Sequence, residues 1–133
     1  MKLAAILILS AFPFLSHADA NPPDISLHDC ISKIENQTTA AMNSCVFTAT
    51  EAWDKELNIV YSKLMLTLNL EGKKILKESQ IAWLKHRDLE YKLIDSVYAL
   101  KSGSMYTNMR AMNILTLTKN RTLELKTYLS SSE

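Results

Sequence analysis

Apolar residues recur along most of the chain at spacings of three and four positions. In the clearest run, between residues 39 and 69, the apolar positions share one face of a helix. Its members are Met42, Val46, Ala49, Trp53, Leu57, Val60, Leu64 and Leu68. The sequence has no run of the strict apolar–polar alternation that marks a strand. The pattern therefore predicts an all-α protein.

Prolines and glycines divide this helical pattern into segments. All three prolines precede residue 24, and Gly72 and Gly103 stand where helices commonly end. The predicted helices run from 27 to 35, from 39 to 69, from 73 to 100 and from 104 to 129. Short loops at the glycines make neighbouring helices antiparallel. We expect an antiparallel bundle of three long helices plus a short N-terminal helix, in one domain spanning 27–129 with a flexible tail at 130–133.

The first twenty residues have the pattern of a cleavable secretory signal. Lys2 precedes an apolar run from Leu3 to Leu15, and Ala18-Asp19-Ala20 ends the segment. The alternative is a retained membrane anchor, but the apolar run is short for a membrane span. We expect a signal peptide at 1–20 and a linker at 21–26. The mature chain then has no membrane-spanning segment and is exported, to the periplasm or the medium.

Length and charge restrict the classes of partner. The mature 113 residues suffice for one domain with a core. The full chain has 15 basic and 14 acidic residues, and this near-neutral balance argues against a nucleic-acid partner. The densest basic group, Lys73, Lys74 and Lys77, is interpreted as a solvated helix face. No glycine-rich phosphate loop is present, and no cofactor is expected.

The two cysteines, Cys30 and Cys45, are expected to form a disulfide because export leads to an oxidising compartment. In the chain-entropy model a loop of this length contributes roughly 3 kcal/mol. The alternative is a metal site that includes His28. Two thiols and one histidine are a poor zinc set, so no metal is expected.

Polar side chains interrupt the apolar faces on both sides of Gly72. Positions equidistant from the turn of an antiparallel hairpin face each other. The predicted pairs are Asp54 with Arg87, Asn58 with Trp83, and Tyr61 with Gln80. A buried guanidinium needs a carboxylate and further acceptors, so we expect a structural polar network, with Arg121 of the last helix as a further member. The alternative, acid–base chemistry by Asp54 and Arg87, lacks a second essential group, and no catalytic residue is predicted.

Several motifs resemble those of the LprI-like lysozyme-inhibitor family. They are WDKELNIVYSKL, ESQIAWLKHRD, SGSM and LTKNRTLEL, together with the spacing from Cys30 through AMNSC. The resemblance covers about residues 29–125. The matching positions are Asp54, Leu57, Asn58, Tyr61, Gln80, Trp83, Arg87, Gly103, Ser104, Thr118 and Arg121.

The resemblance implies an all-helical, exported domain that inhibits lysozyme and has no assigned catalytic residues. One departure stands out. Relatives often have a second cysteine pair, where this chain has Tyr91 and Asn113. The third and fourth helices should therefore be less constrained relative to each other.

Two surfaces are candidates for a protein partner. One is the turn between the third and fourth helices, comprising Lys101, Ser102, Gly103, Ser104 and Met105. The other is a methionine stripe on the fourth helix, Met105, Met109 and Met112, because methionine adapts to varied partners. The alternative for the stripe is burial beneath the first helix, through Ile31 and Ile34.

The sequence is therefore interpreted as a small exported binding protein, not an enzyme, that inhibits lysozyme by stoichiometric binding. A periplasmic binding or immunity module for a different envelope client is the alternative. An enzyme is third, because no Ser/His/Asp set is recognisable.

Overall fold

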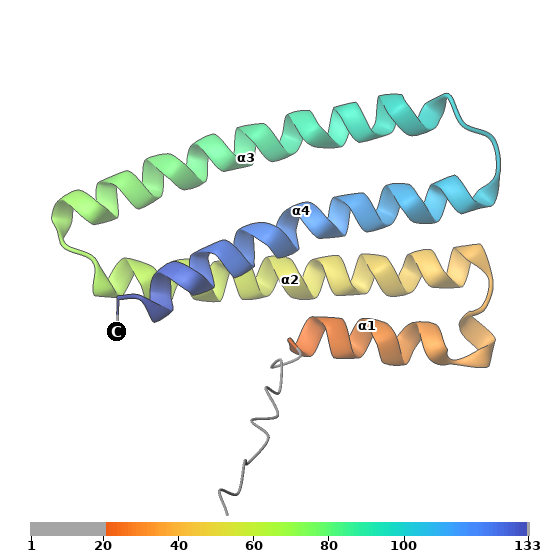
Figure 1. Ribbon diagram of the computed structural model, residues 1–133, viewed down its shortest axis with the longest axis horizontal. Helices are drawn as coiled ribbons and strands as arrows, with labels where there is room; N and C mark the ends of the chain where they lie inside the picture. Colours follow the sequence, from red (N-terminus) through yellow and green to blue (C-terminus); the bar gives the residue numbers. More distant parts are fainter. Residues whose placement is uncertain (1–20, 133) are drawn as a thin grey trace, which may run out of the picture.

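The computed structural model describes residues 21–132, which form an antiparallel all-α bundle with no strand in that range (Figure 1). The helices are α1 (Pro22–Ser32), the 3₁₀ turn η1 (Ile34–Asn36), α2 (Thr39–Thr67), α3 (Leu70–Ala99) and α4 (Ser104–Ser130). This confirms the predicted fold class. The predicted signal peptide lies outside the described residues. No described helix combines the length and apolar character needed to cross a membrane.

The segment 21–26, expected to be a linker, belongs to the first helix instead. Helix α1 begins at Pro22, with Asn21 as its N-cap residue in an extended conformation. Proline is favoured in the first turn of a helix, because it lacks only an amide hydrogen that would have no partner there. Pro23 is buried, so the proline pair starts the folded domain.

Side-chain caps place the helix boundaries near Gly72 slightly differently from the prediction. The side chain of Asn69 accepts a hydrogen bond from the Gly72 amide at 2.8 Å, so α3 begins at Leu70 and Gly72 lies in its first turn. A Cβ at residue 72 would lie 3.3 Å from this capping oxygen. Gly103 has φ +112° and precedes α4, as a glycine at a helix boundary should.

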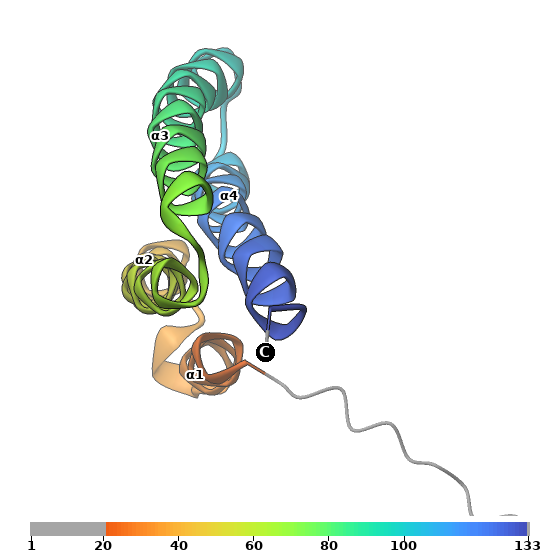
Figure 2. The ribbon, with the colours of Figure 1, turned by 90° about the vertical axis from the view of Figure 1, so that its left-hand side faces the viewer.

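Helix α4 holds the bundle together. It packs extensively against α2 and, less extensively, against α3, whereas α2 and α3 share little contact. Figure 1 shows α3 diverging from α2 beyond their common turn, and Figure 2 shows α3 leaning on α4, away from α1. The two helices expected to form a close hairpin are therefore separated over most of their length.

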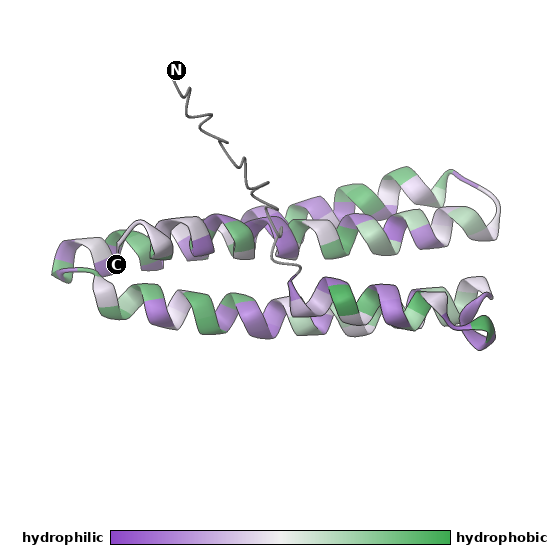
Figure 3. Cartoon of the chain, turned by 60° about the horizontal axis from the view of Figure 1, so that its bottom comes forward, coloured by the Kyte–Doolittle hydropathy of each residue, from purple (hydrophilic) through white to green (hydrophobic). Residues whose placement is uncertain are grey.

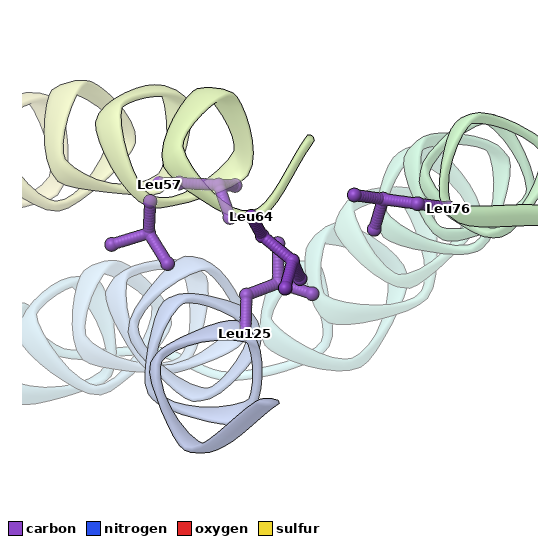
Figure 4. Packing of buried hydrophobic residues seen from close by; sticks show 5 residues of the cluster. Leu57, Leu64, Leu76 and Leu125 are labelled. Atoms are coloured by element: carbon purple, nitrogen blue, oxygen red, sulfur yellow. The ribbon is translucent and has the colours of Figure 1, made fainter. Parts of the chain in front are cut away.

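The core consists of two clusters along the α2–α4 contact. One contains Leu57, Val60, Leu64, Leu76 and Leu125, and the other contains Val46, Ala49, Trp53 and Leu115. Figure 4 shows Leu76 reaching from α3 towards Leu64 of α2 and Leu125 of α4. Trp53 and Leu125 are completely buried. The predicted apolar face of α2 is therefore the face that packs.

Helix α3 is much less buried than its neighbours. Leu76 is the one residue of this 30-residue helix that is fully buried. Large apolar side chains on its outer face remain exposed, among them Leu89, Leu93 and Val97. Hydrophilic and hydrophobic residues accordingly alternate along the helices and are not confined to separate faces of the bundle (Figure 3). Helix α3 is an outlying element supported by α4.

Candidate functional site

A polar network is present, but it is centred on Arg121 and joins α3 to α4. The Arg121 side chain is only 7% exposed. Its Nε donates to Gln80 Oε1 at 3.1 Å, its Nη2 to Ser79 Oγ at 3.0 Å and its Nη1 to Glu124 Oε2 at 2.6 Å. These contacts supply the carboxylate and neutral acceptors that a buried guanidinium requires.

Glu124 is the counter-charge in this network and was not among the residues predicted from the sequence. The hydrogen bond from Arg121 lowers the pKa of Glu124, assisted by a hydrogen bond from Tyr128 Oη at 2.9 Å and opposed by partial desolvation. The same hydrogen bond to Glu124 raises the pKa of Tyr128. The spacing of three residues between Arg121 and Glu124 on a helix was the available signal.

Asp54 and Arg87 do not form the expected pair. Arg87 contacts the adjacent Asp88 at 3.0 Å, and Asp54 is exposed. Asn58 donates to the backbone carbonyl of Asp54 at 2.9 Å and not across to α3. Helices α2 and α3 do not lie side by side: both pack on α4 and diverge, which leaves the opposing polar groups apart.

The remaining predicted network residues lie in the apolar core or at its edge. Tyr61 and Trp83 are half-buried and pack against the cluster around Leu64. The guanidinium carbon of Arg87 lies 5.5 Å from the Trp83 ring centroid and 5.6 Å from that of Tyr91, so the two rings flank it. Among the described residues of the predicted set, Gln80 and Arg121 are the only two whose side chains hydrogen-bond to each other.

The divergence of α2 and α3 leaves an open cavity of about 490 Å³ over α4. Its lining includes Val46 and Phe47 of α2, Tyr91 of α3 and Ile114 of α4. Asn113, expected opposite Tyr91, donates instead to Tyr98 Oη at 2.8 Å. The cavity is mainly apolar and contains no arrangement that suggests acid–base chemistry.

A second polar cluster ties α1 to the body of the bundle. Asp24 accepts a hydrogen bond from Trp53 Nε1 at 3.2 Å and forms an ion pair with Lys119 at 2.7 Å. The disulfide between Cys30 and Cys45 joins the other end of α1 to α2, which confirms the predicted bond. Asp24 was assigned to the linker, and the signal that would have found it is the proline pair that starts α1.

The turn between α3 and α4 and the first two residues of α4, together residues 100–105, are exposed, and contacts between the two helices lie directly behind them. We call this segment the braced tip. It contains Lys101, Ser102, Gly103, Ser104 and Met105. Arg110 Nε donates to Asp95 Oδ1 at 2.7 Å beneath it, and the Tyr98 and Tyr106 rings contact each other with centroids 6.4 Å apart. These contacts join α3 to α4 just behind the turn.

The methionine stripe is exposed rather than covered. Met105, Met109 and Met112 are all partly open to solvent, and Ile34, one of the two residues expected to cover them, is exposed as well. Of the three methionines, Met112 alone lines the cavity that Ile31 also lines. Both candidate partner surfaces therefore lie at or near one end of α4.

Within residues 21–132, no group of three or more His, Cys, Asp or Glu side chains is arranged to hold a metal ion. His28 lies beside Asp29, with 3.6 Å between Nδ1 and the carboxylate. Cys30 is committed to the disulfide. The alternative metal site at His28 is therefore not formed in this part of the chain.

Comparison with protein families matches residues 30–125 to the model of the lysozyme inhibitor LprI. The chain belongs to the LprI family. The description of that family names it as one of lysozyme inhibitors. The matched range contains the disulfide, the Arg121 network and the braced tip.

Among solved structures, the chain is similar to an uncharacterized protein from Burkholderia thailandensis, with a TM-score of 0.81 and 27% sequence identity. The similarity covers 85% of this LprI-family chain but only 55% of the other, so the chain spans about half the length of that protein. A comparison with curated proteins gives no match.

Proposed function

We propose that this LprI-family protein is exported and inhibits a peptidoglycan-cleaving lysozyme by binding it in a fixed molar ratio. The observation that carries the proposal is the family match over residues 30–125. The N-terminal signal pattern and the disulfide agree with an oxidising compartment outside the cytoplasm.

We assign the inhibitory contact to the braced tip. A lysozyme cleft carries paired carboxylates, and the inhibitor must present donors and a cation that enter it. Lys101, the Ser102 hydroxyl and the tip amides provide these groups at an exposed turn. The Arg110–Asp95 pair reduces the conformational freedom that binding would remove, which favours affinity.

Titration of a panel of lysozymes with the chain starting at Asn21 tests the function. We expect inhibition of at least one lysozyme to saturate at a fixed molar ratio. Turnover of any substrate by the chain itself would contradict the proposal that it acts only by binding. A well-folded chain that inhibits no lysozyme would favour the alternative, a module for another envelope client.

Substitutions at the braced tip test the site separately. Lys101→Glu combined with Ser102→Arg should weaken inhibition about tenfold or more, because the cation and the compact donor are lost at the contact, while the melting temperature stays nearly unchanged. Lys85→Glu with Ser96→Arg makes the same chemical changes at exposed positions on α3 and serves as the control. If the parent chain inhibits and the tip variant inhibits equally well, the contact lies elsewhere, with the methionine stripe as the next candidate.

A further inference from the structure

The turn between α2 and α3 combines exposed leucines with unpaired lysines. Leu66 is 81% exposed and Leu70 is 88% exposed, although both are large apolar residues. They lie in the last turn of α2 and the first turn of α3. The two exposed leucines lie four residues apart on either side of the turn, so they place apolar surface at this end of the bundle.

Four lysines lie close to these leucines along the two helices. Lys63, Lys73, Lys74 and Lys77 lie within two helical turns of the loop, and none forms an ion pair within residues 21–132. Residues 63–78 also contain two glutamates, which leaves an excess of two positive charges in this short segment. We call this surface, comprising Leu66, Leu70, Ile75 and the four lysines, the lysine–leucine tip.

The apolar surface continues inwards from this tip. A cavity of about 300 Å³ opens beneath it, and its lining includes Leu68, Ile75 and Leu76. Ile75 is itself 56% exposed, so it connects the outer leucines with the cavity. Figure 3 shows hydrophilic and hydrophobic segments side by side at the turn between α2 and α3.

We propose that the lysine–leucine tip docks on the surface of a bilayer that contains anionic phospholipid. The leucines enter the boundary between headgroups and acyl chains, and the lysines contact the phosphates. Charge complementarity selects this occupant, because anionic headgroups attract clustered lysines while the apolar layer below them receives exposed leucines. A soluble anion would satisfy only the lysines, and an apolar protein surface would satisfy only the leucines.

The other end of the molecule provides a contrast. The braced tip also exposes a leucine, since Leu100 is 86% exposed, but Lys101 is the one charged residue between positions 96 and 109. It therefore has apolar surface without a cluster of cations. The two tips lie at opposite ends of the long axis of the bundle (Figure 1), so docking of one leaves the other free.

Co-sedimentation with vesicles tests the proposal, using the chain from Asn21 so that the apolar run of residues 3–15 is absent. All the helices described here lie within residues 21–132. We expect binding to vesicles of phosphatidylcholine with phosphatidylglycerol at low ionic strength, and much weaker binding to phosphatidylcholine alone. Failure to bind the anionic vesicles, or equal binding to both kinds, would overturn the proposal. Displacement by millimolar glycerol phosphate would also overturn it, because the affinity would then reside in the headgroup alone.

Two pairs of variants locate the contact. Leu66→Ser with Leu70→Ser removes the apolar part, and Lys73→Glu with Lys74→Glu reverses the charge; each should weaken binding about tenfold or more. The control for the leucine variant is Leu100→Ser with Met105→Ser, which removes exposed apolar groups from the opposite end of the bundle. The control for the lysine variant is Lys85→Glu with Lys92→Glu, which makes the same charge change on the middle of α3. Both controls should bind nearly as well as the parent chain. Equal losses in the controls and the tip variants would overturn the assignment to this tip.

Discussion

At the scale of single residues, Arg87 and Arg121 were both predicted to belong to the polar network, but they differ in how deeply they are buried. Arg121 is almost completely enclosed and hydrogen-bonds to three side chains. Arg87 is 23% exposed and lies between two aromatic rings, with Asp88 at the surface as its carboxylate partner. The free energy of unfolding should therefore depend far more on Arg121.

Arg121→Met should lower the free energy of unfolding by about 2–3 kcal/mol, because it removes charge-assisted hydrogen bonds and leaves Gln80 without its donor. Arg87→Met should lower it by about 1 kcal/mol or less, since exposed ion pairs contribute little. Urea denaturation of each variant measures both effects.

A double-mutant cycle between Asp54 and Arg87 tests whether these two residues interact. The two residues do not interact, so the effects of their substitutions should add to within about 0.5 kcal/mol. A larger coupling energy would mean that α2 and α3 approach each other more closely in solution than they do in this structure.

Glu124 gives the network a dependence on pH. Its pKa is lowered in the folded state, chiefly by Arg121, so its stabilising contribution is fully present above the ordinary glutamate value of about 4.3. That contribution is lost as the pH falls below this value, through the lowered folded-state pKa. Glu124→Gln should therefore be less stable than the parent at pH 7, and the difference should shrink as the pH falls towards 3. Thermal melts over this range measure it, and a difference that stays constant with pH would contradict the assignment.

At the scale of helices, α3 stands apart because its burial is concentrated at one end. Leu76 anchors its beginning in the leucine cluster, and Gln80 and Ser79 follow in the Arg121 network. Further along, its outer face carries exposed Leu89, Leu93 and Val97. Few buried apolar contacts mean a low free energy for local opening.

Hydrogen exchange should reveal this gradient. Amides of α3 between residues 86 and 97 should exchange faster than those of α2 between residues 53 and 64, because the latter pack against α4. Exchange followed by mass spectrometry at peptide resolution measures both segments in one sample. Equal protection of the two segments would show that α3 is covered in solution, for example by a second copy.

At the scale of the whole molecule, the sequence predicted the helices well because their signals are local. Apolar spacing determined the packed face of α2, and the cysteines determined the disulfide. Which helices pack together is a different kind of property. Asp54 would lie opposite Arg87 only if the consecutive helices α2 and α3 were in contact, whereas α4 takes the central position. The spacing of three residues indicates the Arg121–Glu124 pair, but the contacts of Arg121 with Gln80 and Ser79 depend on how α3 packs against α4.

The central position of α4 also determines when the chain can fold. Each apolar cluster contains one fully enclosed residue from this last helix, Leu125 in one and Leu115 in the other. A nascent chain that ends before residue 104 lacks both, so it cannot complete either cluster. Structure that depends on such distant parts of a chain forms only after nearly all of it has been made. For the exported protein proposed here, synthesis and passage through a membrane channel would then proceed on an unfolded chain, and the bundle would close on the far side.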